Sequence, residues 1–167
     1  KYKDWKAIVI GDEPREKIEL YHKNINNLGF TKHSKVLETF KKSSIAVACS
    51  RWEEPFGRTS LEASSRGCAV IISNRGGLPE TITNGIILKK LNNYELFKSI
   101  ENLIKNKNKL KELQLKSYNN FFLTDNYSSS KIDIYRDKIL KKLKTTYKIS
   151  KSLNHLKILH VTNFNER

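Results

Sequence analysis

The sequence predicts an α/β protein with a Rossmann-like, doubly wound parallel sheet and helices on both faces of that sheet. Over the first ninety residues, short apolar runs alternate with polar segments of helical length, the pattern of repeated βαβ units. Two runs, residues 44–49 and 68–73, are almost continuously apolar and do not alternate apolar with polar residues as half-exposed strands do. Helices are therefore expected to cover both sides of each strand. The 167 residues give room for one ordinary domain and not for two full ones.

Five strands are expected, because five apolar runs are separated by turn-forming residues. The second run is the weakest and carries a glycine, Gly29. The predicted strands are Lys6–Ile10, Asn24–Phe30, Ser44–Cys49, Cys68–Ser73 and Gly85–Leu88.

Helices are expected between and after these strands. Pro14 favours a helix at Arg15–Lys23, since proline is tolerated in the first turn. Ser34 is expected to cap a second helix at Lys35–Lys42, and a third is expected to follow Gly57. The later amphipathic runs begin at Asn92 and continue at Lys109–Phe122 and Ile132–Leu143.

The domain organisation follows from where this pattern stops. Residues 1–149 are expected to form one ligand-binding domain, and residues 150–154 a linker. Residues 155–167 contain the strand-like run Leu156–Val161 and are expected to start a following domain or to add an edge strand. The chain has no Met and opens on Lys1, so we expect it to be an internal part of a longer protein.

The chain is strongly basic, with 32 Lys and Arg, 17 Asp and Glu, and a formal net charge of +15. Proteins that bind nucleic acid or anionic membranes often carry such a charge. Here the lysines are spread along predicted surface helices without an interleaved aromatic and basic platform, so no nucleic-acid partner is expected. Cys49 and Cys68 lie in apolar runs without metal-ligand spacing, which favours buried thiols in the cytoplasm.

The most informative stretch is residues 50–80. Glu54 and Glu62 have seven residues between them, and Pro55–Gly57 separates a predicted buried strand from a helix. In an open parallel sheet, ligands bind outside the carboxyl ends of the strands. A helix that starts there offers unpaired N–H groups and a positive dipole end, so anion binding is favoured. Gly76–Gly77 opens a similar loop after the next strand.

Each of these residues also has a purely structural interpretation. Arg58 and Glu62 are four residues apart and could form only a surface ion pair. Glu53 and Glu54 could be solvated loop residues, and Gly57 a simple turn glycine. Their joint occurrence at the correct point of a βαβ pattern favours a binding site.

This stretch resembles the C-terminal half of a GT-B glycosyltransferase, in particular the large retaining family 4. The hallmark of that family is a Glu-x7-Glu motif, which reads EPFGRTSLEA at Glu54–Ala63. A G-x-x-V-I segment at Gly67–Ile71 and a GG-x-P-E loop at Gly76–Glu80 follow it in the family order. The resemblance runs from about residue 6 to residue 143.

The resemblance implies that residues 1–149 bind a nucleotide-diphosphate sugar as donor, with transfer under retention and with no metal or other cofactor. Glu54, the implied catalytic residue, would position donor-sugar hydroxyls, and Glu62 would accept hydrogen bonds from the ribose. The implied donor-binding residues are Glu54, Pro55, Phe56, Gly57, Arg58, Thr59 and Glu62, with Leu28, Gly29 and Phe30 flanking the base and Gly76 and Gly77 beneath the site.

Two parts of such an enzyme are expected to lie outside this chain. They are the N-terminal acceptor-binding domain and the Arg and Lys pair that neutralises the phosphates, so the chain alone is expected to be inactive. We expect the full protein in the cytoplasm, with association at the inner membrane face as a further option. A non-catalytic module that binds a nucleotide or phosphorylated ligand through a basic surface is the alternative. The sequence leaves the sugar, base and acceptor open.

Overall fold

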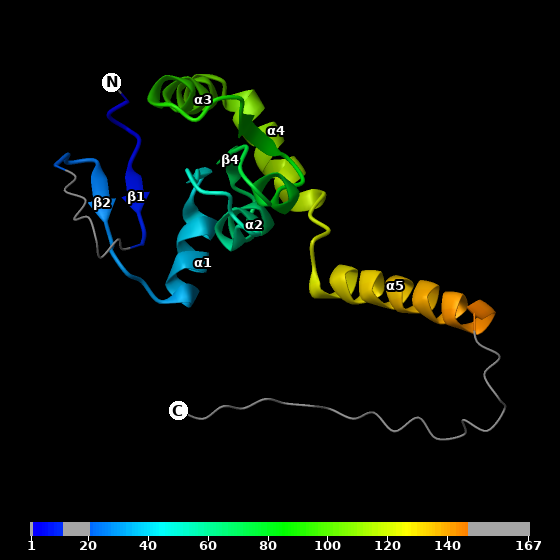
Figure 1. Cartoon of the computed structure of the whole chain (residues 1–167). Coiled ribbons are helices and arrows are strands. Elements are labelled where there is room, and N and C mark those ends of the chain that lie inside the picture. The colour runs from blue at the N-terminus through cyan, green and yellow to red at the C-terminus, as the bar shows by residue number, and fades with distance from the viewer. Residues whose placement is uncertain (1, 12–20, 147–167) are drawn as a thin grey trace. The chain divides into compact units, whose positions relative to one another are not determined.

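The computed structural model describes residues 2–11 and 21–146 (Figure 1). The chain divides into two compact units, Lys1–Leu123 and Thr124–Arg167, and each is considered by itself. The predicted linker at 150–154 and the predicted strand-like run in 155–167 lie outside the described residues, as does most of the helix predicted at Arg15–Lys23.

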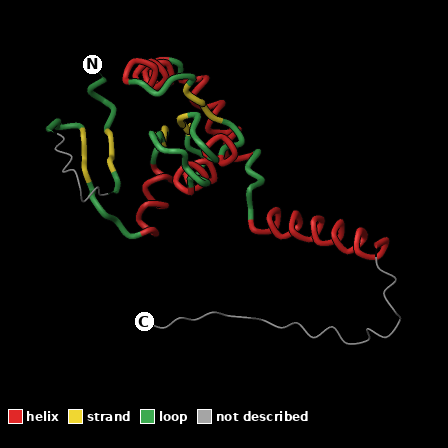
Figure 2. Tube along the Cα trace, viewed as in Figure 1, coloured by secondary structure: helices red, strands yellow, loops and turns green. Residues whose placement is uncertain are grey.

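All described strands of the first unit run parallel, as the sequence predicts. β1 (Ala7–Val9) pairs with β2 (Ile25–Asn27), and β4 (Ala69–Ser73) lies between β3 (Ile45–Ala48) and β5 (Gly85–Leu88). Figure 2 shows these strands in yellow, separated by red helices. Parallel pairing brings the carboxyl ends of β3, β4 and β5 to one edge of their sheet.

The described strands form two sheets, β1–β2 and β3–β4–β5, where the sequence predicts one, and helices cover the three-stranded sheet. The first unit contains α1 (His33–Lys42), α2 (Arg58–Ser65), the 3-10 helix η1 (Leu78–Thr81), α3 (Asn93–Lys105) and α4 (Lys107–Asn119). In the second unit, α5 (Asp125–Thr146) begins seven residues before the predicted start at Ile132. The earlier start follows from Thr124, whose side chain and carbonyl accept hydrogen bonds from the N–H groups of Tyr127 and Ser128.

The core lies on both faces of β4, which confirms the doubly wound arrangement. One face packs Val70 and Ile72 with residues of α2 and η1, and the opposite face packs Ala69 and Ile71 with residues of β5, α3 and α4. All five residues of β4 are buried. β3 differs from the expectation of full cover, because Val47 is 44% exposed. Among the described strands β3 pairs with β4 alone, so one of its edges is open.

Two local predictions are wrong. Ser34 does not cap α1, which begins at His33 after Lys32, with no side-chain cap. The carbonyl of Lys32 already accepts from the first-turn N–H groups of Lys35 and Val36, so the helix starts before Ser34. The last residues of the predicted helix Arg15–Lys23 are not helical but lead into a turn before β2.

Candidate functional site

The loop between β3 and α2 is fastened to the end of β4. The backbone N–H of Ser50 donates to the hydroxyl of Ser73 at 2.9 Å, and that hydroxyl donates back to the Ser50 carbonyl at 2.8 Å. Ser73 is fully buried, so this reciprocal pair satisfies polar groups that would otherwise be costly to bury. The loop between β3 and α2, residues 49–57, is called the motif loop below, and its start therefore has a fixed position relative to the sheet.

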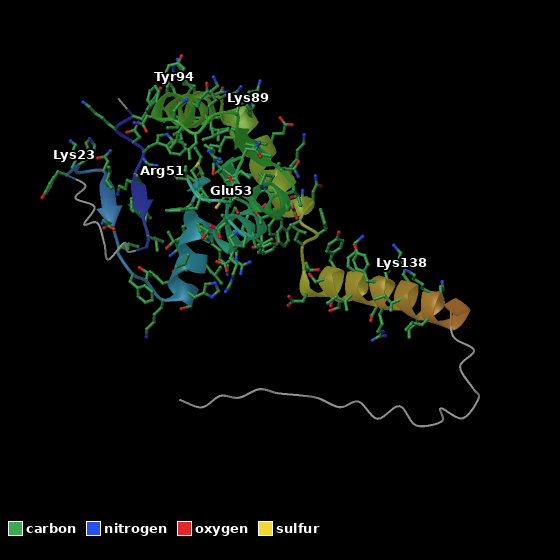
Figure 3. All side chains as sticks on the ribbon, viewed as in Figure 1. Lys23, Arg51, Glu53, Lys89, Tyr94 and Lys138 are labelled. Carbon is green, nitrogen blue, oxygen red and sulfur yellow. The ribbon has the colours of Figure 1, made fainter. Side chains whose placement is uncertain are left out.

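The two glycine-containing loops are joined through Glu53 and Glu54. Glu53 accepts from the guanidinium of Arg75 at 3.0 Å and from the N–H of Gly76 at 2.6 Å, while the carbonyl of Glu54 accepts from Gly77 at 2.7 Å. The Arg75 hydrogen bond, followed by the Gly76 N–H, lowers the pKa of the Glu53 carboxyl below its usual value. Figure 3 marks Glu53 in this loop. Glu53 is thus a connector of the loops and not merely a solvated residue.

Gly57 starts α2 in a conformation that favours glycine. Its φ is +87°, and a Cβ added there would lie 2.5 Å from the Leu78 side chain. No side chain among the described residues caps α2. The hydroxyl of Ser60 donates to the Gly57 carbonyl and shares a hydrogen bond with Thr81, which fixes the start of α2 to η1. The first N–H groups and the positive dipole end of α2 are therefore left for a ligand.

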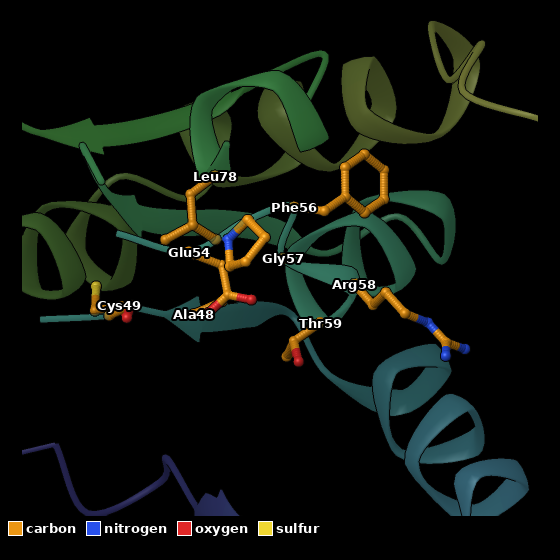
Figure 4. A pocket seen from close by; sticks show the side chains of 10 residues that line it. Ala48, Cys49, Glu54, Phe56, Gly57, Arg58, Thr59 and Leu78 are labelled. Carbon is orange, nitrogen blue, oxygen red and sulfur yellow. The ribbon is translucent and has the colours of Figure 1, made fainter. Parts of the chain in front are cut away.

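A cavity of about 490 Å³ lies between the end of β3 and the start of α2 (Figure 4). In the close-up, the Arg58 side chain extends away from Glu54. The lining residues are Ala48, Cys49, Ser50, Glu54, Pro55, Phe56, Gly57, Arg58, Thr59 and Leu78. Six of the seven implied donor-binding residues thus share one cavity.

Glu62 does not line this cavity. It lies one turn further along α2, where its carboxylate oxygen Oε1 is 2.9 Å from Nε2 of His33 and 3.3 Å from Nη2 of Arg58. The Glu62 side chain is only 18% exposed. The surface pair with Arg58 that the sequence allows is therefore present, but a histidine from α1 joins it.

The other predicted residues do not line the cavity. Leu28, Gly29 and Phe30 follow β2 in a loop, where the Thr31 hydroxyl contacts the first two carbonyls and the Phe30 side chain is 87% exposed. Gly76 packs directly against the Glu54 backbone, because a Cβ on Gly76 would overlap the Glu54 carbonyl oxygen. The loop that contains Gly76 and Gly77, called the glycine loop below, therefore packs against the backbone of the motif loop.

A second, polar hollow of about 390 Å³ lies at the ends of β4 and β5. Figure 3 marks Lys89, one of its basic residues. The lining residues are Ser73, Asn74, Arg75, Leu88, Lys89, Lys90 and Leu91.

Sequence reasoning missed His33 and the connecting role of Glu53. It also missed four residues that line the cavity, Ala48, Cys49, Ser50 and Leu78. Ser50 and Leu78 could have been found, because they follow the strand and the glycine pair of motifs already recognised. His33 gives no such signal, since it lies 29 residues before its partner.

Across residues 2–11 and 21–146, no group of three or more His, Cys, Asp or Glu side chains is arranged to hold a metal ion. Both cysteines are free thiols; Cys68 is buried as predicted, whereas Cys49 is only partly buried. None of the described helices combines the length and apolar character needed to span a membrane.

Comparison with curated proteins finds similarity to short parts of two longer sequences. Spore coat protein SA of Bacillus subtilis is 36% identical over 62 residues, which are 37% of this chain and 16% of that protein. Glycogen synthase of Mycobacterium tuberculosis is 38% identical over 58 residues, 35% of this chain and 14% of that protein. The chain thus matches only a small part of each relative's length.

Solved structures show the same fold. A glycosyltransferase from Rickettsia africae has a TM-score of 0.64 at 24% identity, covering 82% of this chain and 41% of that one. HepE from Anabaena, in complex with UDP-glucose, has a TM-score of 0.60 at 19% identity, covering 78% and 41%. The parallel sheet and its helices are similar to those of GT-B glycosyltransferases. The family model described as "Glycosyl transferases group 1" matches residues 1–120, so the chain belongs to that family of glycosyl transferases.

Proposed function

We propose that this chain is the donor-binding domain of a glycosyltransferase that takes a sugar from a nucleotide-diphosphate donor and transfers it with retention. The observation that carries the proposal is the cavity in which Glu54 and the uncapped start of α2 meet at the carboxyl end of β3. The Anabaena protein with the same fold binds UDP and UDP-glucose, which supports a donor of this class.

The start of α2 suits the diphosphate. Its backbone N–H groups and dipole favour negative charge. Arg58 lines the cavity, although its guanidinium pairs with Glu62. Charge grows on the departing diphosphate as the glycosidic bond breaks, so fixed N–H dipoles stabilise the transition state more than the ground state. The whole enzyme needs further cations and an acceptor-binding domain, which we propose lie in other parts of the protein.

The two motif carboxylates have separate roles in this proposal. Glu54 lies in the cavity, where it would accept hydrogen bonds from sugar hydroxyls and position the sugar; we do not assign it nucleophilic attack. Glu62 lies one turn further along the helix and would accept hydrogen bonds from the ribose. Leu28–Phe30 would flank the base, since α1 connects this loop to Glu62 through His33.

We propose that the reaction needs no metal, and that the full enzyme is located in the cytoplasm and acts at the inner face of the membrane. The free thiols Cys49 and Cys68 are compatible with a reducing compartment.

Titration of UDP into the 167-residue chain, followed by NMR, tests the assignment of the two carboxylates. Glu62→Gln should weaken UDP binding about ten- to hundredfold, because a charged hydrogen bond contributes roughly 1.5–3 kcal/mol. Glu54→Gln should change UDP binding little, since UDP lacks the donor sugar whose hydroxyls Glu54 would contact. Glu112→Gln, on the exposed surface of α4, is the matched control. Equal weakening by the two motif variants, or none by either, would contradict the assignment.

A further inference from the structure

The contacts of Glu62 use its two carboxylate oxygens unequally. His33 and Arg58 both approach Oε1, at 2.9 and 3.3 Å, and no described group donates a hydrogen bond to Oε2. An ionised carboxylate only accepts hydrogen bonds, so the His33 ring must carry hydrogen on Nε2 to make this contact. One oxygen of a largely buried carboxylate is therefore held, and the other has no hydrogen-bond donor among the described residues.

We propose that His33 is a positioning residue that holds Glu62 by Oε1 and thereby leaves Oε2 to accept hydrogen bonds from the ribose hydroxyls of the donor nucleotide. The proposal rests on the donor site proposed above and adds to it a residue from outside the motif.

The two donors to Oε1 differ in how firmly they fix the carboxylate. Arg58 lies one turn earlier on the same helix, its side chain is long and 75% exposed, and such exposed pairs within one helix are weak. His33 comes from a different helix, has a short and rigid side chain, and makes the shorter contact. A donor from a second element restricts both the rotation of the carboxylate and the spacing of α1 and α2. His33 therefore determines which oxygen of Glu62 remains open.

His33 also lies close in the chain to the loop that we propose flanks the nucleotide base. His33 is the first residue of α1 and follows the loop Leu28–Phe30 after two intervening residues. The proposed base-flanking loop is thus attached to the proposed ribose carboxylate by one side-chain hydrogen bond. Loss of that bond should weaken recognition of the nucleoside and leave the diphosphate contacts at the start of α2 in place.

The test compares UDP with 2′,3′-dideoxyuridine diphosphate, which lacks both ribose hydroxyls, by NMR titration of the 167-residue chain. The wild type should prefer UDP. In His33→Ala that preference should fall about fivefold, the factor expected for one hydrogen bond, while affinity for the dideoxy compound stays unchanged. His33→Gln keeps an N–H donor and should restore much of the preference. Lys35→Ala removes a cation from the same helix, where Lys35 pairs with Glu38, and should match the wild type.

The outcomes distinguish the ribose-binding role of Glu62 from the positioning role of His33. A wild type that binds both nucleotides equally would overturn the ribose role of Glu62 and, with it, the role of His33. A wild-type preference that survives in His33→Ala would overturn the positioning role alone. Equal weakening of both nucleotides in His33→Ala, without rescue by His33→Gln, would show a general structural role and would also overturn it.

Discussion

Replacing Gly76 by Ala should destabilise the first unit strongly, because the glycine loop and the motif loop touch through their backbones. Gly76 has a φ of +50°, and a Cβ there would overlap the Glu54 carbonyl oxygen and lie 2.7 Å from the Glu54 nitrogen. Gly29 provides a matched control. Its φ of +57° is nearly the same, but a Cβ on Gly29 would have no atom within 4 Å.

The comparison of the two variants isolates the steric effect. The left-handed conformation costs an Ala about 1–2 kcal/mol, and the less flexible unfolded chain returns about 0.4–1 kcal/mol. Gly29→Ala should therefore lower the free energy of unfolding by about 1 kcal/mol. Gly76→Ala adds an overlap with backbone atoms, which cannot rotate away as a side chain can, and overpacking of this kind costs about 1–3 kcal/mol. The total for Gly76→Ala is about 2–4 kcal/mol.

Urea unfolding followed by tryptophan fluorescence measures both values in the full 167-residue chain. The chain has two tryptophans, Trp5 and Trp52, both in the first unit, and Trp52 belongs to the motif loop itself. The reasoning is refuted if Gly76→Ala is no less stable than Gly29→Ala, because the packing of the two loops would then tolerate a Cβ.

Three further predictions concern stability and reactivity. The hydrogen bond from Arg75 lowers the pKa of Glu53 below that of an ordinary Glu, so the stabilisation from Glu53 is present above the ordinary Glu pKa and lost as the pH falls through the lower, folded value. The difference in urea midpoint between wild type and Glu53→Gln should accordingly be present at neutral pH and close on acidification. Burial raises the pKa of the Cys68 thiol to about 11, so iodoacetamide at about pH 8 should modify Cys68 only after urea is added, as mass spectrometry would show. The Asn92 side chain accepts a backbone hydrogen bond in the first turn of α3, and Asn92→Ala should lower the free energy of unfolding by about 1 kcal/mol in the same urea assay.

The parts of the fold that the sequence predicts are those governed by local pattern. The apolar run around β4 predicts a strand covered on both sides, and all of its residues are buried. The predicted breaks at Gly57 and Gly76 coincide with positive φ angles in the structure. These features depend on a residue type and its immediate neighbours, so one sequence is enough to recognise them.

The features that the sequence does not predict depend on packing between distant segments. The contact of His33 with Glu62 exists because α1 lies against α2, and nothing in the residues around His33 indicates that partner. From the sequence alone, Glu53 is a carboxylate in a loop. Its connecting role appears only in the folded chain, where Arg75 and Gly76 donate hydrogen bonds to it. The predicted start of α1 at Ser34 is wrong for a related reason. The residue before α1, Lys32, accepts the first helical hydrogen bonds with its backbone carbonyl and makes no side-chain cap. Because every residue has a backbone carbonyl, the sequence does not indicate this start.

Mapping of UDP onto the backbone amides of the 167-residue chain by NMR tests the central claim most directly. The claim is that the uncapped start of α2 holds the donor diphosphate. We expect weak binding, on the order of millimolar, because we propose that the phosphate-binding cations and the acceptor domain lie in other parts of the protein. The largest shifts should fall on the amides of residues 56–62, with smaller shifts at 28–33. Saturable shifts centred on the hollow around Lys89 and Lys90, or no saturable shift at all, would contradict the claim.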